Sequence, residues 1–252
     1  MLYGDKDEVF FLYSDNRSKG SIEKFLKKFR GVLLSDAYVV YENIAKKYHD
    51  QIEHALCWAH TRREFFEALS ACPVQADTAL EYIKKIYAVE EQIREQKLTE
   101  ESKHTFRLTH SKHVVEEFFE WLKAEELKND LLPSNRFSKA VRYALHREEG
   151  LKVFLENPDV QVDTNHLERA LRPIPMGRKN WLFCWTEVGA EAVAVIQTLI
   201  ASCKLHHVNP FEYFVDVLQQ VDSCPQSQVA ELTPRNWALR KKALRGEDAA
   251  TA

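Results

Sequence analysis

The chain has 252 residues, of which 45% are hydrophobic and 29% are charged, and its formal net charge is −3. This composition predicts a soluble globular protein of one or two domains and excludes a uniformly basic nucleic-acid-binding coat. Only 7 glycines and 8 prolines occur, and neither a P-loop nor a G-x-G-x-x-G motif is present, which argues against a nucleotide cofactor.

The five cysteines lack the close spacing of a disulfide framework, which favours reduced thiols. The polar start has no apolar segment typical of a secretory signal. The longest apolar stretch, Ala190–Ala201, contains Glu191 and is too short to span a bilayer. These features predict a cytoplasmic protein without a membrane segment.

The first part of the chain has a strand–helix–strand pattern. The apolar run Glu8–Ser14 predicts a buried strand, and Ser21 is placed to cap a short helix that Gly31 would end. Val32–Leu34 predicts a second buried strand that leads directly to Asp36. This order is typical of an α/β sheet.

Helical periodicity follows a further predicted strand at Gln51–Leu56 and continues from Arg62 to about Asn157. The apolar stripe is interrupted at Thr99–Lys112 and Lys128–Pro133, where we expect loops between helices.

A third region begins near residue 162, where Asp163 is placed to cap a helix that Pro173 would stop. The aromatic segment Asn180–Trp185 is predicted to be extended. Ala190–Cys203 is apolar nearly all round, which predicts a helix buried on every side. A last amphipathic helix is expected after Asn209.

Two carboxylates are candidate functional groups. Asp36 follows a buried strand, at the position where α/β sheets bind ligands, although it could instead cap the following turn. Glu168 shares one helix face with Asn165, Arg169 and Arg172, and the alternative is an ordinary solvated face.

A basic and aromatic cluster lies close to Glu168 in an otherwise mildly acidic chain. Point charges of this kind bind phosphates and aromatic rings stack on bases, although a solvated surface with core tryptophans has the same pattern. The cluster consists of Arg169, Arg172, Arg178, Lys179, Trp181 and Trp185.

The pair Cys57 and His60 has the spacing of half a zinc site. A structural zinc site needs four ligands, and no second pair follows at a useful distance. A packed thiol and a hydrogen-bonded histidine are therefore favoured over a metal site.

Taken together, these segments resemble the transposases of the insertion sequence 66 family, which belong to the DDE superfamily. The resemblance covers about residues 9–222 and is carried by motifs in a fixed order. They are Gly31-Val-Leu-Leu-Ser-Asp36-Ala-Tyr38, Cys57-Trp-Ala-His60-x-Arg62-Arg63-x-Phe65-Phe66, Asp163-x-Asn165-x-x-Glu168-Arg169-Ala-x-Arg172-Pro173, Gly177-Arg-Lys-Asn-Trp-Leu-Phe183, and Lys204-Leu205 followed by Asn209-Pro210.

The resemblance implies that Asp36 and Glu168 are two of three catalytic carboxylates that bind two Mg²⁺ or Mn²⁺ ions. Such a metal pair promotes in-line phosphoryl transfer at the ends of double-stranded transposon DNA. The DNA contacts implied are Arg169, Arg172, Arg178, Lys179 and Trp181, and the supporting residues implied are Tyr38, Cys57, His60 and Asn165.

The resemblance also implies an α/β fold with a ribonuclease H-like core, interrupted by a large all-helical insertion and followed by a helical C-terminal segment. We expect residues 1–60 and 162–206 to form the core, 61–161 the insertion and 207–252 the C-terminal helix and tail. Asp36 and Glu168 lie 132 residues apart, and the insertion accounts for that separation.

The chain departs from the family pattern in one major respect. The first catalytic aspartate and its strand have no counterpart, so we expect an incomplete core and a truncated fragment with little activity alone. The alternative is a non-catalytic module that binds DNA or a full-length transposase. An intact member is expected to form a homo-oligomer. Smaller departures are Ala37 in place of glycine and Thr164 in place of asparagine.

Overall fold

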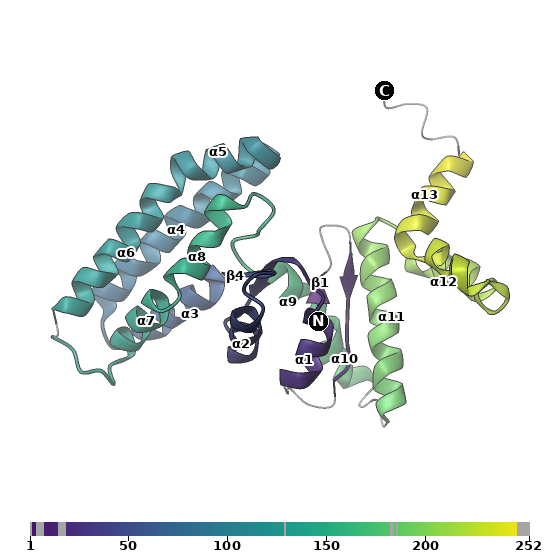
Figure 1. The fold of residues 1–252 in the computed structure, drawn as a ribbon, viewed down its shortest axis with the longest axis horizontal. Helices are drawn as coiled ribbons and strands as arrows, with labels where there is room; N and C mark the ends of the chain where they lie inside the picture. The colour runs from purple at the N-terminus through teal and green to yellow at the C-terminus, as the bar shows by residue number, and fades with distance from the viewer. Residues whose placement is uncertain are drawn as a thin grey trace. The chain divides into compact units, whose positions relative to one another are not determined.

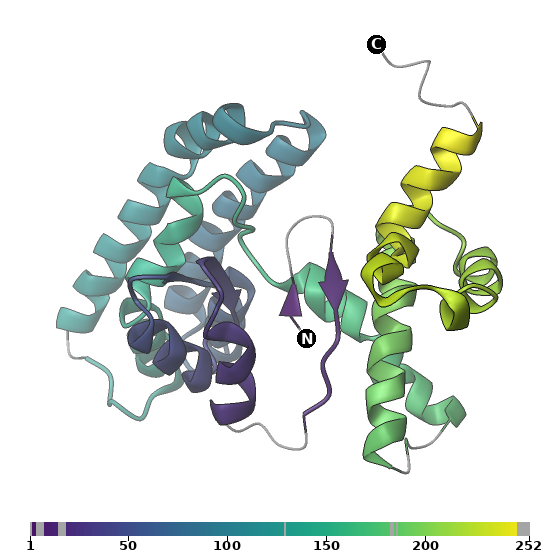
Figure 2. The same cartoon turned by 45° about the vertical axis from the view of Figure 1, so that its right-hand side comes forward.

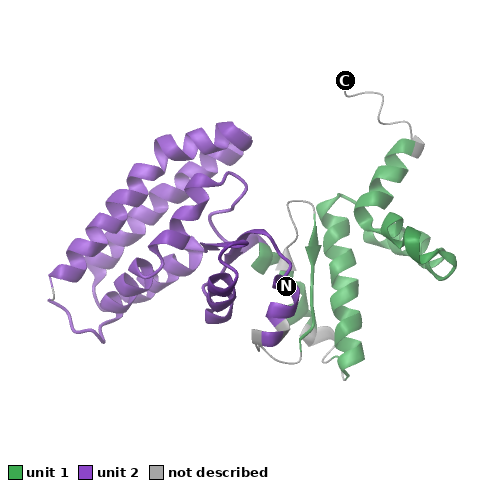
Figure 3. Ribbon diagram, viewed as in Figure 1, with its two compact units in different colours: residues 1–16, 167–252 green, residues 17–166 purple. Residues whose placement is uncertain are grey.

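The computed structural model describes residues 2–3, 8–14, 19–128, 130–181, 184 and 186–245. The chain divides into two compact units, which Figure 3 shows in different colours. Unit 1 comprises residues 1–16 and 167–252, and unit 2 comprises residues 17–166. The expected tail after residue 245 and the expected boundaries of the ribonuclease H-like core stay predictions, the tail because it lies outside the described residues.

Unit 2 begins with a short α/β segment. Its elements are α1 (Lys19–Leu26), β3 (Gly31–Ser35), α2 (Val39–Lys47) and β4 (Ile52–Leu56). The two strands are parallel, with Gly31 opposite Ile52 and Ser35 opposite Leu56, and α2 makes the crossover that parallel pairing requires. Both predicted strands therefore exist, although Val32–Leu34 is half-buried rather than buried.

The boundaries of the first helix differ from the expectation. Ser21 lies inside α1 rather than at its cap, because the helix begins at Lys19. Gly31 does not end the helix, which stops at Leu26; it starts β3 instead. The φ of Gly31 is 128°, a conformation that glycine adopts without the steric cost of a side chain.

Strand β3 has one free edge within unit 2. At its two ends, Gly31 N–H donates to Gln51 O (2.9 Å) and Cys57 N–H donates to Ser35 O (3.1 Å). The backbone N–H and C=O groups of every second residue of β3 therefore point toward β4. The backbone groups of the residues between them point toward the opposite edge. No strand among the described residues of unit 2 pairs with that edge. Two-stranded sheets are marginally stable, and an open edge is a site for a further strand.

The rest of unit 2 is helical, as the periodicity predicts (Figures 1 and 2). The large buried side chains Trp58, Phe65, Phe118, Phe119 and Phe137 form its core. The interruption at 128–133 is confirmed for the residues described there, since no helix covers them. The helices are α3 (Trp58–Ala68), α4 (Pro73–Glu95), α5 (Glu100–His110), α6 (Lys112–Leu127), α7 (Arg136–Leu145) and α8 (Glu148–Glu156).

The loop predicted at Thr99–Lys112 is wrong, because most of this segment forms α5. Thr99 and Ser102 make a reciprocal capping box that starts the helix. The inward-facing residue is the fully buried Arg107, so the helix packs against the core without an apolar stripe. A pattern based on hydrophobicity cannot detect such a helix.

Unit 1 contains a short antiparallel pair, β1 (Leu2–Tyr3) and β2 (Val9–Phe10). The strand predicted at Glu8–Ser14 therefore exists but is only two residues long. It packs on α11 (Glu187–Leu205), where Phe11 N–H donates to Thr198 Oγ1 (2.8 Å). The Ser202 hydroxyl donates to Val9 O (3.2 Å), so polar side chains of α11 continue the pairing of the strand.

Helices form the remainder of unit 1. Tyr213 and Trp237 are buried in a small separate core, and the Tyr213 hydroxyl donates to Leu232 O (2.7 Å). The helix expected after Asn209 is confirmed, and Asn209 caps it, but a further helix at 234–245 was not predicted. The elements are α9 (Asn165–Leu171), α10 (Pro173–Trp181), α11, α12 (Pro210–Leu218), η1 (Val221–Ser223), η2 (Gln226–Leu232) and α13 (Pro234–Arg245).

The extended segment predicted at Asn180–Trp185 is wrong in its first part. Pro173 ends α9 as expected, but it also opens α10, since proline is favoured at the first position of a helix. Asn180 and Trp181 are the last residues of that helix. Leu182, Phe183 and Trp185 lie outside the described residues.

The helix predicted at Ala190–Cys203 exists as part of α11, but it is not buried on every side. Val195 is 59% and Ile196 46% exposed, and Cys203 is its one fully buried residue in the described part. Among the described helices, α11 alone has the length and apolar composition of a membrane span. One such helix is weak support for a membrane protein, because the core helix of a soluble protein meets the same criteria.

Candidate functional site

Asp36 lies in the turn between β3 and α2, immediately after the strand ends. Its side chain is exposed, and its Oδ1 accepts the Tyr38 N–H (3.2 Å). The carboxylate is thus held by the backbone at the carboxyl end of a strand while it faces solvent. Both original interpretations of Asp36, a turn cap and a functional group, fit this geometry.

The turn requires a left-handed backbone conformation at Ala37, whose φ is 62°. A Cβ in this region costs about 1 kcal/mol, which glycine avoids. We therefore predict that Ala37→Gly raises the free energy of unfolding by about 0.5 to 1 kcal/mol. Urea unfolding followed by circular dichroism measures this change, and Ala45→Gly, inside α2, is the matched control that should destabilise. A loss of stability in Ala37→Gly would contradict the strain at this turn.

Two tyrosines lie beside Asp36. The rings of Tyr38 and Tyr41 meet edge to face, with centroids 6.1 Å apart. Burial, reinforced by the negative charge of Asp36 and by Tyr38, raises the pKa of Tyr41 above its usual value. Tyr41 therefore stays protonated at neutral pH, and Tyr38 packs against its ring. The structural role that the resemblance implies for Tyr38 stays a prediction.

A side-chain hydrogen bond between Ser35 Oγ and His54 Nε2 (2.8 Å) joins the end of β3 to the middle of β4. Burial lowers the pKa of His54, against smaller opposing contributions from Glu42 and Asp36. The imidazole is therefore neutral at pH 7, and it braces the strand end that precedes Asp36.

Cys57 connects the sheet to the segment that leads to Glu168. Its thiol is buried, and Sγ accepts both the N–H and the hydroxyl of Thr164, each at 3.3 Å. Burial alone would raise the pKa of Cys57, but hydrogen bonds from His60 and Thr164 outweigh it and leave the pKa below its usual value. This contact fits the packed-thiol interpretation, since the sulfur accepts two hydrogen bonds from Thr164. The described residues contain no group of three metal-ligating side chains.

Trp58 strengthens the same connection. Its N–H donates to Val162 O (3.0 Å), and its indole Nε1 donates to Leu151 O (2.9 Å). Since Trp58 is fully buried against Phe118 and Phe154, the segment before α9 is attached to the core of unit 2.

Asp163 and Asn165 form the start of α9. The Tyr87 hydroxyl donates to Asp163 Oδ2 (2.9 Å), and Asp163 Oδ1 accepts the Asn165 N–H (3.0 Å). The Asn165 amide donates a further bond to Asp163 Oδ2 (2.6 Å). Asp163 caps the helix as expected, although the helix begins two residues later. The supporting role that the resemblance implies for Asn165 stays a prediction.

Glu168 is exposed and lies in α9, three residues after Asn165. Arg169 and Arg172 are exposed as well, and the Arg172 N–H donates to Glu168 O (3.1 Å). The boundary between the two units falls inside α9, between His166 and Leu167. Asp36 therefore belongs to unit 2 and Glu168 to unit 1. Their convergence on shared metal ions stays a prediction.

The other predicted DNA contacts, Arg178, Lys179 and Trp181, lie in α10. Their side chains are outside the described part of the structure.

Local pattern does not reveal several residues that shape this region, among them His54, Tyr87 and Thr164. Each acts through a partner far away in the chain, and Thr164 and Cys57 are 107 residues apart.

A family model described as "Transposase IS66 family" matches residues 2–192, and a second, "IS66 C-terminal element", matches residues 198–235. The chain belongs to the IS66 transposase family. The resemblance carried by the Asp36, Cys57 and Glu168 motifs is thereby confirmed at the level of the family.

Curated relatives of this IS66 family member come from Sinorhizobium fredii (strain NBRC 101917 / NGR234). It is 32% identical to the uncharacterized protein y4jD over 239 residues, which cover 91% of this chain and 45% of that protein. It is 30% identical to the uncharacterized protein y4qI over 236 residues, or 91% of this chain and 43% of that protein. The chain thus spans less than half the length of these relatives. No solved structure matches it.

Proposed function

We propose that this chain is a transposase segment whose intact protein transfers phosphoryl groups at the ends of double-stranded transposon DNA. The observation that carries this proposal is Asp36, an exposed carboxylate at the carboxyl end of β3, within a chain that matches the IS66 family over most of its length. Glu168, on α9, is the second proposed catalytic carboxylate. The proposal includes a cytoplasmic location for the intact protein.

Asp36 and Glu168 have the chemistry that a hard divalent cation requires. Both are exposed carboxylates, and Mg²⁺ or Mn²⁺ prefers carboxylate oxygens together with water. When bound, a metal pair stabilises the attacking and leaving oxygens of an in-line displacement. The residues of this chain would hold the ions: Asp36 from its backbone-braced turn, and Glu168 from a helix whose start is anchored by Cys57 and Tyr87.

The third ligand of the proposed site would come from outside the described residues. The free edge of β3 supports this idea, because one more strand there would extend the sheet next to Asp36. A completed sheet of this kind would be a ribonuclease H-like core, with the helices α3 to α8 as its insertion. Without such a strand, the chain on its own is expected to have little cutting activity.

The same free edge favours a second candidate function. A strand from another copy or from a longer relative could pair with β3, so the isolated chain could act as a binding module rather than as an enzyme. Homo-oligomer formation by the intact protein is part of the first proposal.

DNA binding by this chain tests the proposal. Arg169, Arg172, Arg178, Lys179 and Trp181 are the proposed contacts, and phosphate contacts make affinity fall steeply with salt. We predict that fluorescence anisotropy detects binding of duplex DNA at low salt. A combined Arg169→Met, Arg172→Met variant should weaken this binding by about a hundredfold or more, since each lost contact costs about 1.5 kcal/mol or more.

The paired variant Lys84→Met, Arg94→Met, which also removes two positive charges but from the exposed surface of α4, is the control and should bind normally. Absence of binding by the unaltered chain at low salt would overturn the proposed function. In a strand-cleavage assay with Mg²⁺, robust cutting that Glu168→Gln abolishes would contradict the expectation that this chain alone cuts little DNA.

A further inference from the structure

Arg147 lies at the junction of α7 and α8, and its side chain is held in a defined position. The guanidinium carbon lies 4.0 Å from the centre of the Tyr143 ring, and Nη1 donates to Tyr143 O (3.1 Å). Stacking on an aromatic face restrains the planar guanidinium while leaving its outer donors available.

The backbone after Arg147 packs directly on β4. At Gly150, an added Cβ would lie 2.8 Å from the Leu56 side chain and 3.0 Å from the His54 carbonyl oxygen. His54 in turn bonds to Ser35, the residue before Asp36. Close packing at this glycine therefore brings the start of α8 against the pair of strands that ends at Asp36.

Electrostatic effects agree with this placement. Burial lowers the pKa of His54, and the positive charge of Arg147 is among the further causes. Burial raises the pKa of Tyr143, and the negative charge of Asp36 contributes to that rise. Arg147 and Asp36 thus act on the same group of side chains at this end of the sheet.

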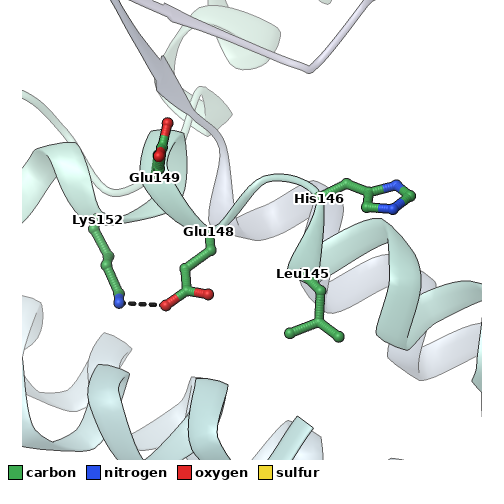
Figure 4. Close-up of a pocket in the computed structure, with 5 residues that line it drawn as sticks. All are labelled: Leu145, His146, Glu148, Glu149 and Lys152. Carbon is green, nitrogen blue, oxygen red and sulfur yellow. Dashed lines mark hydrogen bonds and ion pairs between the residues drawn. The ribbon is translucent and has the colours of Figure 1, made fainter. Parts of the chain in front are cut away.

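The acidic residue next to Arg147 in the chain is already neutralised. Figure 4 shows Glu148 paired with Lys152 at the edge of a shallow depression that Leu145, His146 and Glu149 also line. Lys123 binds the other oxygen of Glu148 at 2.9 Å. Glu148 therefore has two cations of its own and makes no ion pair with Arg147.

Glu42, the other carboxylate that influences this region, pairs with Lys46 at 2.7 Å. Arg147 makes no ion pair with any carboxylate in the described ranges, and its buried Nε has no hydrogen-bond partner there. A buried donor without a partner is costly, and most such groups in native proteins bind something. Arg147 as a whole is half-buried, so an anion beside Asp36 would bind at the outer edge of the guanidinium and supply an acceptor that the described residues lack.

We propose that Arg147, supported by Tyr143, binds a phosphate group of DNA beside Asp36. This inference rests on the proposed function, since it takes the DNA substrate as the source of the anion. The guanidinium fork matches the geometry of phosphate oxygens and can donate two parallel bonds. Arg147, at the junction of α7 and α8, then positions the DNA strand next to Asp36, the proposed catalytic carboxylate.

The test compares duplex DNA binding by Arg147→Met, Arg147→Lys and the unaltered chain across a salt series in EDTA. Loss of one charge-assisted phosphate contact predicts about tenfold weaker binding for Arg147→Met and a salt dependence reduced by about 0.9 in the log–log slope. Arg147→Lys keeps the charge but loses the fork and the stack, so we expect intermediate affinity and an unchanged slope.

Arg136→Met is the matched control, because Arg136 lies on α7 and is paired with Glu64 and Glu67. It should bind DNA normally, and urea unfolding verifies that each variant is folded. If the unaltered chain binds DNA and Arg147→Met binds with the same affinity and slope, this inference is overturned while the proposed function stands. If the unaltered chain does not bind, the proposed function itself fails.

A second arm tests the position of the phosphate. In EDTA the Asp36 carboxylate repels a phosphate held by Arg147, so Asp36→Asn should tighten DNA binding. The gain should shrink when Arg147→Met is also present, because interacting sites give non-additive effects. Equal gains in both backgrounds would place the phosphate away from Arg147.

Discussion

Replacing Arg107 with methionine will lower the free energy of unfolding by about 3 to 5 kcal/mol, the usual effect of breaking a buried ion pair. Arg107 is fully buried and binds Glu90 through two parallel bonds, from Nε (2.7 Å) and Nη2 (2.8 Å). Its Nη1 donates to the carbonyl oxygens of Phe154 (2.7 Å), Asn157 (3.1 Å) and Val160 (3.0 Å). The substitution leaves a buried carboxylate and three carbonyl groups without their donor.

Urea unfolding followed by circular dichroism measures the loss. The double variant Glu90→Leu, Arg107→Met should be more stable than Arg107→Met alone, since it leaves no buried charge. Arg94→Met is the matched control: its pair with Glu91 is exposed, so its effect should stay within about 0.5 kcal/mol. A change of less than about 1 kcal/mol in Arg107→Met would show that the network contributes little.

This network also bears on the proposed site. The carbonyl groups that Arg107 binds belong to the end of α8 and the loop that follows, just before Val162 and Thr164. The Val162 carbonyl oxygen accepts the bond from Trp58, and Thr164 donates to Cys57. Arg107 therefore stabilises the path by which the chain returns from the helical block to the start of α9.

Asp36→Asn and Glu168→Gln should each weaken Mn²⁺ binding by tenfold or more, because removal even of outer-shell partners of metal ligands costs 10- to 100-fold. Each substitution preserves size while it removes the charge that a hard cation requires. If the two residues share their ions, the double variant should bind no more weakly than either single variant, since the second substitution removes a ligand from a site already lost.

Electron paramagnetic resonance of free Mn²⁺ measures this binding. Asp50→Asn and Glu191→Gln, both exposed carboxylates, are the controls and should have little effect. Independent, additive losses in the two variants would indicate separate weak sites. Unchanged binding in both would remove the metal ions from the proposal.

The strands and most helices follow from local pattern. The apolar run at Val32–Leu34 and the helical spacing after Arg62 identify elements because burial of side chains on one face requires that periodicity. The same logic fails for α5, where Arg107 is buried through partners on other elements. It also overestimates the burial of α11, because an apolar composition does not reveal how much surface a helix finds to cover it.

The candidate site likewise combines residues that local motifs identify with contacts that only the folded structure shows. Asp36, Cys57 and Glu168 could be selected because they lie in motifs whose order resembles a known family. The bonds from Thr164 to Cys57 and from Tyr87 to Asp163 could not, since they join residues far apart in the chain and depend on the folded core. Arg147 belongs to no motif, and its buried Nε without a hydrogen-bond partner becomes visible only in the structure.

Metal-directed cleavage of the backbone tests most directly whether Asp36 and Glu168 bind the same metal ions, as proposed. Fe²⁺ that replaces Mg²⁺ generates hydroxyl radicals in the presence of ascorbate and peroxide, and these cut the chain close to the bound ion. A shared site predicts cuts near both residue 36 and residue 168, and Asp36→Asn should suppress both. Cuts at only one of these segments, or cuts near residue 168 that persist in Asp36→Asn, would contradict a shared site.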